Sequence, residues 1–174
     1  MQKSKSDGFT LIELLVVLLI VGLVAGLVIP RVFNTLTHVE LKSATRETAS
    51  FLNQARDFSY YKKKYMKVSF NLTTGHISLS EQQNTTQEDN FSAGPEMVWV
   101  RIKDFFLPEG VYVQKCVQKD KTTESGVFNI LFYPAGNANG GTIRLMNKKG
   151  RHFLIRVDTI TGDARIIEEK NENE

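Results

Sequence analysis

The feature that most constrains this chain is an apolar run from Phe9 to Ile29 that contains a single acidic residue, Glu13. As a helix, these 21 residues would extend about 31 Å, which matches a hydrocarbon core of roughly 30 Å. Lys3 and Lys5 precede the run, and the positive-inside rule then places the short N-terminus in the cytoplasm. We therefore expect a single-pass anchor followed by an extracytoplasmic domain.

Two simple interpretations of the apolar run leave Glu13 unexplained. A secretory signal peptide has a shorter apolar region and a small-residue cleavage site, and this run fits neither pattern cleanly. A plain membrane anchor would bear a cost of roughly 2.5–3.5 kcal/mol for a carboxylate at mid-helix, and less near the interface. A carboxylate in such a segment indicates a function and requires a cationic partner. Cleavage between Gly8 and Phe9 would supply one, because the new α-amine of Phe9 lies four residues before Glu13.

The string Gly8-Phe9-Thr10-Leu11-Ile12-Glu13-Leu14 resembles the class III signal of type IV pilins and of the pseudopilins of type II secretion. The resemblance implies that prepilin peptidase cleaves after Gly8 and that the new N-terminal Phe9 is N-methylated. It implies that Glu13 serves docking and assembly. It also implies a helix kink at Pro30, where the membrane half of the helix meets the soluble half; the alternative is a helix that stops at this proline.

An amphipathic pattern continues beyond Pro30 and predicts one helix from about Phe9 to Tyr61. Its apolar face recurs at spacings of three and four residues and comprises Leu41, Ala44, Thr48, Phe51, Leu52, Ala55 and Phe58. The cluster at Lys62–Lys64 suits the negative end of a helix dipole, and we expect a solvated helix end there, with phosphate binding as the alternative.

The rest of the chain alternates between apolar and polar positions, which predicts strands joined by turns. A hairpin is expected from Met66–Leu72 and His76–Ser80, and a long surface loop from Gln82–Glu96. Further strands are expected at Met97–Lys103, Val111–Gln118, Val127–Tyr133, Thr142–Asn147, Arg151–Asp158 and Ala164–Ile167. The fold class is therefore α+β, with a long N-terminal helix packed on a mostly antiparallel β-sheet head of type IV pilin-like design.

The C-terminal half resembles the head of minor pseudopilins of the GspH/FimT type. The resemblance rests on the turn Phe132-Tyr133-Pro134-Ala135-Gly136, the strand that follows Gly141, and a closing hairpin at Thr161-Gly162; residues 82–126 have no match. Together the two resemblances imply four segments. These are a leader peptide at 1–8, a transmembrane and filament-core half of the helix at 9–30, an amphipathic half at 31–64, and a periplasmic β-rich head at 65–174.

No catalytic, cofactor or metal site is predicted, and we expect a protein that is not an enzyme. The glycine-rich stretch 134–141 lacks the Lys-Ser/Thr of a phosphate loop and falls between strands, so it is expected to be a turn. His38, His76 and His152 have no ligand spacing with Cys116 or with paired carboxylates.

The closing loop and the single cysteine set the chain apart from major pilins. Cys116 cannot form an intramolecular disulfide and is expected to be a small buried apolar residue. No obvious acidic cluster for calcium appears in the closing loop, although Asp158 and Asp163 leave a calcium site open.

The leading functional interpretation is a minor pseudopilin, a structural subunit of the periplasmic pseudopilus of type II secretion. The expected partners are other pseudopilins or pilins, prepilin peptidase and the bacterial inner membrane, with Glu13 neutralising a neighbour's Phe9 amine inside the filament. The alternative is a minor type IV pilin of FimT-like type that acts in pilus assembly or DNA uptake. Its basic candidates are Lys62–Lys64, Lys115, Lys119, Lys121, Lys148, Lys149 and Arg151. The mild net charge of +3 and the acidic residues 168–174 argue against nucleic acid.

Overall fold

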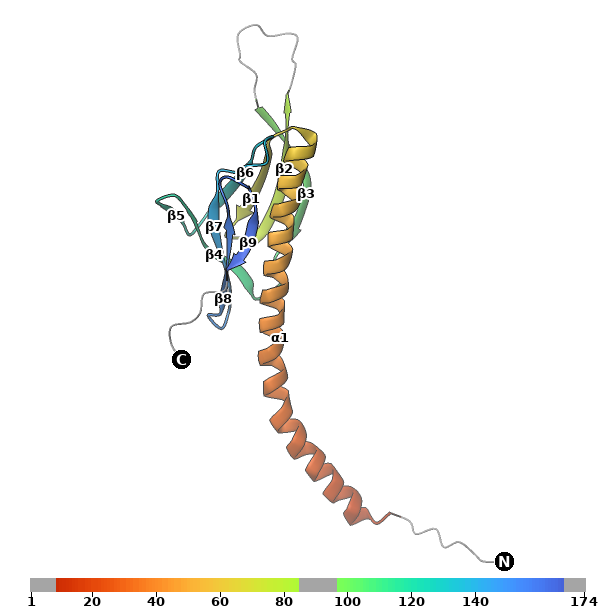
Figure 1. Cartoon of the computed structure of the whole chain (residues 1–174). Helices are drawn as coiled ribbons and strands as arrows, with labels where there is room; N and C mark the ends of the chain where they lie inside the picture. The colour runs from red at the N-terminus through yellow and green to blue at the C-terminus, as the bar shows by residue number, and fades with distance from the viewer. Residues whose placement is uncertain (1–8, 85–96, 168–174) are drawn as a thin grey trace, which may run out of the picture. The chain divides into compact units, whose positions relative to one another are not determined.

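The computed structural model describes residues 9–84 and 97–167, with the backbone alone over 25–38 and at Asn84 and Met97 (Figure 1). One helix, α1 (Leu11–Lys62), precedes all the strands of the described chain. The chain divides into two compact units, Met1–Thr37 and His38–Glu174, which are described separately below. The backbone of α1 is helical through Pro30, so the helix does not stop at this proline.

The second unit begins with the amphipathic part of α1, whose predicted apolar face is buried. Leu41, Leu52 and Ala55 are fully buried, and Phe58 packs against the core from its edge. Two threonines share this face, and their hydroxyls donate to backbone carbonyls one turn earlier. Thr45 Oγ1 lies 2.7 Å from the Leu41 oxygen, and Thr48 Oγ1 lies 2.8 Å from that of Ala44. Because these bonds satisfy the hydroxyls, threonine is tolerated at buried helix positions.

The first sheet has four antiparallel strands in the order β3-β2-β1-β6. They are β1 (Met66–Asn71), β2 (His76–Asn84), β3 (Met97–Phe106) and β6 (Val127–Phe132). The predicted hairpin of β1 and β2 is confirmed, but β2 continues to Asn84, so the expectation that a loop begins at Gln82 is wrong. The reason is tertiary: Gln82 pairs with Trp99 and Asn84 with Met97 on β3. Ladder pairing therefore overrides the polar composition, and the remainder of the predicted loop, 85–96, lies outside the described residues.

The second sheet has five antiparallel strands in the order β5-β4-β7-β8-β9. They are β4 (Val111–Gln118), β5 (Lys121–Thr123), β7 (Gly141–Asn147), β8 (His152–Val157) and β9 (Ala164–Ile167). We expected one sheet, and the structure has two. Strands of both sheets bury alternate residues on one face, so the two sheets and α1 enclose a common core.

The core joins residues from α1 and from both sheets. The ring of Phe51 on α1 meets that of Phe105 on β3 edge-on, with 5.0 Å between centroids. Cys116 on β4 is fully buried, and this burial raises the pKa of its thiol to about 12. The expectation that Cys116 is a small buried apolar residue agrees with this position.

Candidate functional site

The predicted processing motif lies where α1 begins. Gly8 falls outside the described residues, whereas Phe9 and Thr10 precede the first helical residue, Leu11. The Thr10 carbonyl oxygen accepts a hydrogen bond from the Glu13 amide at 3.1 Å, and the Thr10 hydroxyl oxygen lies 3.4 Å from the same nitrogen. Thr10 therefore occupies the N-cap position and places Glu13 in the first turn, where the helix dipole favours a carboxylate.

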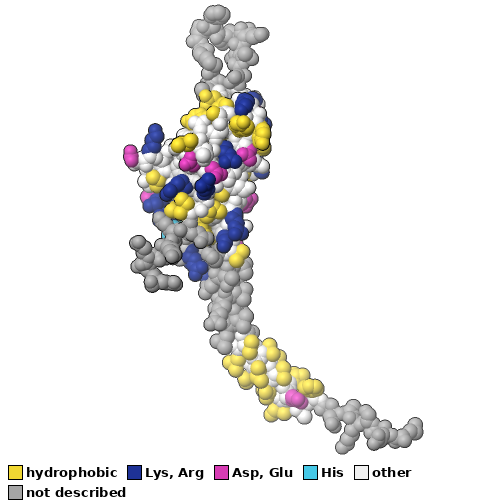
Figure 2. Space-filling view, viewed as in Figure 1, with side chains coloured by type: hydrophobic (Ala, Val, Ile, Leu, Met, Phe, Trp, Pro, Cys, Tyr) yellow, Lys and Arg dark blue, Asp and Glu magenta, His cyan; other side chains and the backbone are white. Residues whose placement is uncertain are grey.

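The helix after this cap presents large apolar side chains on every side. From Leu11 to Val24 the exposed fractions of its large apolar residues run from 47% at Val16 to 85% at Leu11. Figure 2 shows this stretch as a nearly continuous apolar surface. Apolar exposure around the whole circumference is typical of a helix that is covered by lipid or by other helices.

Within the described residues, no helix contains a stretch long and apolar enough to cross a membrane. Side chains from Ala25 to His38, including that of Pro30, are not described. The kink at Pro30 therefore stays a prediction.

The basic C-terminal end of α1 forms ion pairs with Glu81, a residue that the sequence analysis did not single out. Lys62 Nζ lies 2.6 Å from Glu81 Oε2, and Lys64 Nζ lies 2.5 Å from Glu81 Oε1. Glu81 is only 7% exposed. Hydrogen bonds from Lys62 and then Lys64 lower the pKa of its carboxyl group.

Lys63, the third cation of this cluster, lies against an aromatic ring. Its Nζ is 3.9 Å from the centroid of the Tyr60 ring. Two of the three lysines are thus paired with Glu81 and the third stacks on Tyr60. All three lysines are exposed, as the prediction of a solvated helix end expects, and the pairing with Glu81 is an additional contact that the sequence did not indicate.

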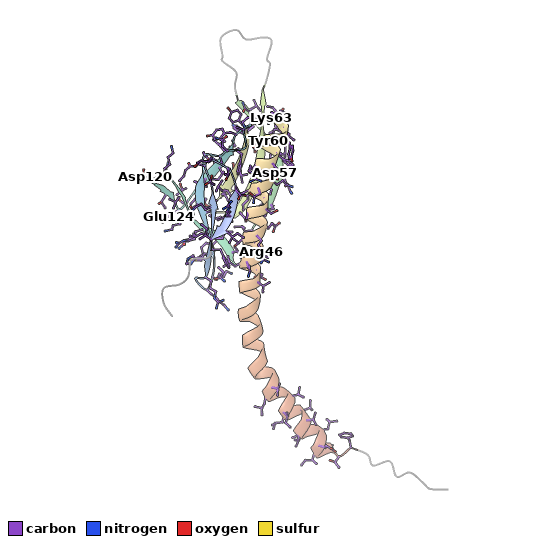
Figure 3. All side chains as sticks on the ribbon, in the orientation of Figure 1. Arg46, Asp57, Tyr60, Lys63, Asp120 and Glu124 are labelled. Atoms are coloured by element: carbon purple, nitrogen blue, oxygen red, sulfur yellow. The ribbon has the colours of Figure 1, made fainter. Side chains whose placement is uncertain are left out.

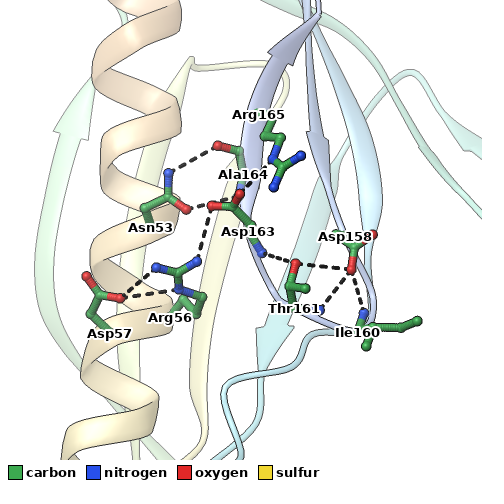
Figure 4. A network of polar contacts seen from close by, with 9 residues as sticks. All are labelled: Asn53, Arg56, Asp57, Asp158, Ile160, Thr161, Asp163, Ala164 and Arg165. Carbon is green, nitrogen blue, oxygen red and sulfur yellow. Dashed lines mark hydrogen bonds and ion pairs between the residues drawn. The ribbon is translucent and has the colours of Figure 1, made fainter.

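The side chain of Asn53 on α1 forms hydrogen bonds with the backbone of the last strand, β9, as a neighbouring strand would. Asn53 Oδ1 accepts a hydrogen bond from the Ala164 amide at 2.9 Å, and Asn53 Nδ2 donates to the Ala164 carbonyl oxygen at 3.1 Å (Figure 4). β9 is the edge strand of its sheet, so this amide satisfies backbone groups that have no partner strand. Asn53 is not among the residues of the predicted apolar face, and only the folded structure brings it to β9.

A charged cluster lies beside this contact (Figure 4). Asp163 accepts from Arg56 Nη1 at 3.1 Å through one oxygen and from Arg165 Nε at 2.7 Å through the other. Arg56 also contacts Asp57 at 3.0 Å. Since both oxygens of Asp163 are engaged by guanidinium groups, this carboxylate has a structural role.

Asp158 closes the adjacent turn. Its Oδ1 accepts hydrogen bonds from the amides of Ile160 and Thr161, both at 2.8 Å. Backbone hydrogen bonds from Thr161 and then Ile160 lower the pKa of its carboxyl group. No group of three or more His, Cys, Asp and Glu that could hold a metal ion occurs among the described residues. The calcium site left open at Asp158 and Asp163 gains no support from these contacts.

The two glycine turns singled out in the sequence lie against each other. Gly136 and Gly162 both have positive φ, of 91° and 65°. A Cβ on Gly162 would collide with the Gly136 carbonyl oxygen and press on the Arg56 side chain. Only glycine fits this approach, so the two turns and the helix meet at one point.

The histidines form no ligand set in the described part of the chain. His76 Nε2 lies 2.7 Å from Asp104 Oδ2, and its ring is 4.6 Å from that of Phe106. His152 is partly buried on β8, and the side chain of His38 is not described.

A family model, the prokaryotic N-terminal methylation motif, matches residues 3–29 of this chain. No match is found among the curated proteins. Two structures of the minor pseudopilin EpsH from the type 2 secretion system of Vibrio cholerae have the same fold. One is 11% identical with a TM-score of 0.53 and covers 74% of this chain and 96% of its own. The other is 10% identical with a TM-score of 0.54 and covers 77% of this chain and 97% of its own.

A structure of the type IV minor pilin FimU from Pseudomonas aeruginosa is 13% identical, covers 76% of this chain and 90% of its own, and has a TM-score of 0.48.

The N-terminal methylation motif thus covers residues 3–29, and the described chain has an α+β fold like that of the minor pseudopilin EpsH.

Proposed function

We propose that this protein is a minor pseudopilin, a non-catalytic structural subunit of the periplasmic pseudopilus of a type II secretion system. The observation that carries the proposal is the methylation motif over residues 3–29, which includes the first part of α1, together with a fold like that of EpsH. EpsH is a minor pseudopilin of a type 2 secretion system, and the assignment of this chain to such a system is our inference from that likeness.

Prepilin peptidase would cleave between Gly8 and Phe9, after which Phe9 would be N-methylated. Residues 1–8 would then be the leader, 9–30 the transmembrane and filament-core half of the helix, 31–64 its amphipathic half, and 65–174 the periplasmic head. The apolar surface from Leu11 to Val24 supports this division, because its exposed side chains need lipid before assembly and neighbouring helices after it.

Glu13 would act as the assembly residue. It lies in the first helical turn, one turn from Phe9, and its carboxylate is exposed. In a bundle of such helices, offset along their axes, Glu13 of one subunit would meet the Phe9 amine of a neighbour. A charge pair in a medium of low dielectric offsets the cost of placing either charge there alone. The carboxylate would therefore set the register between subunits.

The alternative, a minor type IV pilin that acts in pilus assembly or DNA uptake, loses part of its support. Lys62 and Lys64 share the single carboxylate of Glu81, which offsets one of the three positive charges at the end of α1. A pilin that does not bind DNA would still fit the fold and the motif, and only the assembly system can separate it from a pseudopilin.

The first experiment is the intact mass and N-terminal sequence of the membrane-extracted protein, produced with and without prepilin peptidase. A chain that begins at methylated Phe9 only when the peptidase is present supports the proposal. A chain that begins at Met1 under both conditions contradicts it.

Glu13→Gln should be processed normally but recovered in sheared pseudopili at a level at least about tenfold lower than the wild type, since an unpaired amine in the bundle is costly. The matched control is Glu47→Gln, which removes an exposed carboxylate of the same helix within the head unit. If both variants are recovered in sheared pseudopili at the same level, Glu13 has no role in assembly.

A further inference from the structure

The two sheets of the head have four edge strands, which are β3 and β6 in the first sheet and β5 and β9 in the second. An edge strand presents backbone amide and carbonyl groups that can pair with a strand of another chain, and natural proteins usually block such edges. In the described chain, the edges of β5, β6 and β9 are short or blocked, whereas the edge of β3 is not.

An asparagine blocks the edge of β9 and another blocks the edge of β6. Asn53 forms hydrogen bonds with the amide and the carbonyl group of Ala164 on β9, as described above. On β6, the Leu131 amide donates to Asn139 Oδ1 at 3.0 Å, and the Asn139 amide donates to the Leu131 carbonyl oxygen at 3.0 Å. These backbone groups of β6 and β9 are therefore unavailable to a further strand.

The edge of β5 is protected by its length and by charge. The strand has only three residues, Lys121–Thr123, and the acidic residues Asp120 and Glu124 flank it (Figure 3). A short edge with charged residues is a poor template for pairing with another chain.

The edge of β3 is long and lacks such a block. With ten residues, β3 is the longest strand of the described chain, and it pairs with β2 alone among the described segments. The register with β2 shifts at Ile102, which has no partner on β2 and forms a β-bulge. The bulge interrupts the edge and leaves residues 98–101 as a regular segment, which we call the free edge of β3.

The free edge of β3 has the composition of a pairing strand. Val98, Trp99 and Val100 are β-branched or aromatic, and such residues favour β structure. Val98 and Val100 alternate with Trp99, so the two valines lie on one side of the strand, and they are 40% and 36% exposed. An added strand would therefore bury further apolar surface at this edge.

Two cations lie on the other side of the free edge. Lys67 and Arg101 belong to one row of the first sheet, where a single residue of β2 separates them. Lys67 Nζ lies 4.3 Å from the centroid of the Trp99 ring, so this ring is on the same side. Neither cation forms an ion pair with a described residue, whereas Asp104 Oδ2 lies 2.7 Å from His76 Nε2. The charge beside the free edge is thus positive and complements an acidic partner.

We propose that the free edge of β3 binds an extended segment of another protein by strand addition, and that this segment alternates acidic with apolar residues. Backbone hydrogen bonds with residues 98–101 join the segment to the sheet. Its acidic side chains meet Arg101 and Lys67 on one side. Its apolar side chains cover Val98 and Val100 on the other. This inference is independent of the assignment to a secretion system, because it concerns only one edge of the head.

The test uses the end-blocked heptapeptide Val-Glu-Val-Glu-Val-Glu-Val, which reads the same in both directions and therefore fits a parallel or an antiparallel register. Trp99 is the only tryptophan of the chain, so the fluorescence of the full chain in detergent micelles reports binding at this edge. We expect a saturable change in Trp99 fluorescence and slower hydrogen exchange of the amides within residues 98–101. The peptide Val-Lys-Val-Lys-Val-Lys-Val should bind at least about tenfold more weakly, because its lysines repel Arg101 and Lys67.

Two variants and a modified peptide separate the contributions of charge and backbone. Arg101→Gln should weaken binding of the acidic peptide by about threefold, which is typical of an exposed ion pair. The matched control is Arg156→Gln, which removes an exposed arginine of the second sheet and should leave the affinity unchanged. N-methylation of the glutamates in the peptide removes backbone donors and should weaken binding by at least about tenfold.

Three outcomes would overturn the proposal. The first is the absence of a saturable fluorescence change at about 1 mM acidic peptide, where even a weak specific site is occupied. The second is equal affinity of the acidic and basic peptides, or of the methylated and unmethylated peptides, because charge or backbone pairing would then have no role. The third is slow exchange of residues 98–101 without peptide together with dimerisation in sedimentation, which would assign the edge to a second copy of the chain.

Discussion

Replacement of Asn53 by alanine tests how the head is closed. The substitution removes an acceptor for the Ala164 amide and a donor to the Ala164 carbonyl, at 2.9 and 3.1 Å. Ala164 is only 6% exposed, so its amide and its carbonyl group would lose their hydrogen-bond partners where little water can replace them. An unsatisfied buried polar group costs about 1–3 kcal/mol, and because Asn53 is itself half-buried, water would recover part of this loss.

We expect Asn53→Ala to lower the free energy of unfolding by about 2 kcal/mol in total. For a unit of this size that corresponds to a fall in Tm of roughly 8 °C. The assay is thermal unfolding of the full chain in detergent micelles, followed by circular dichroism. Hydrogen exchange gives a local measurement, since the Ala164 amide should exchange faster in the variant.

The matched control is Glu47→Ala, a truncation at an exposed position of the same helix, which should change Tm by no more than about 2 °C. If Asn53→Ala resembles this control and the Ala164 amide keeps its protection, β9 is held by packing alone and the reasoning fails.

Two further changes follow from the titrating groups. Hydrogen bonds from Lys62 and Lys64 lower the pKa of the Glu81 carboxyl group in the folded chain. Glu81 therefore stabilises the fold fully above the pKa of an unfolded glutamate, about 4.3, and this stabilisation is lost as the pH falls through the lowered pKa of the folded state. Glu81→Gln should therefore lower Tm at pH 7 but approach the wild type at pH 3; an equal difference at both pH values would contradict the pairing. Burial raises the thiol pKa of Cys116 to about 12, so iodoacetamide at pH 8 should label it only after unfolding. Stoichiometric labelling of the native chain, measured by intact mass, would show that β4 opens readily.

The long helix and most strands can be predicted because the spacing of apolar residues that identifies each element lies within a short segment of sequence. The spacing of Leu41, Leu52 and Ala55 identifies one helix face, and these residues are buried as expected. The strands Val111–Gln118 and Ala164–Ile167 begin and end where alternation predicts. The short strand β5 was missed, because Lys121–Thr123 has no apolar alternation and exists only through its pairing with β4.

The division into two sheets and the contacts of the head could not be predicted in the same way. Alternation in β1 and in β7 is alike, so it cannot say which strands pair. Glu81 lies 19 residues from Lys62, and Ala164 lies 111 residues from Asn53. Each partner looks like an ordinary polar residue in its own segment, and only the tertiary fold brings the pairs together.

The contact between Asn53 and Ala164 also determines when the head can finish folding. Ribosomes synthesise the chain from its N-terminus, so the helix exists long before its last partner strand does. Asn53 and Ala164 are 111 residues apart, so their contact forms only after the whole chain between them has been synthesised. Until residue 164 has been synthesised, the helix face around Asn53 lacks its contact with β9. A chain that stops before β9 should therefore expose apolar surface and be a target for chaperones and proteases, even though most of its sheets are already encoded.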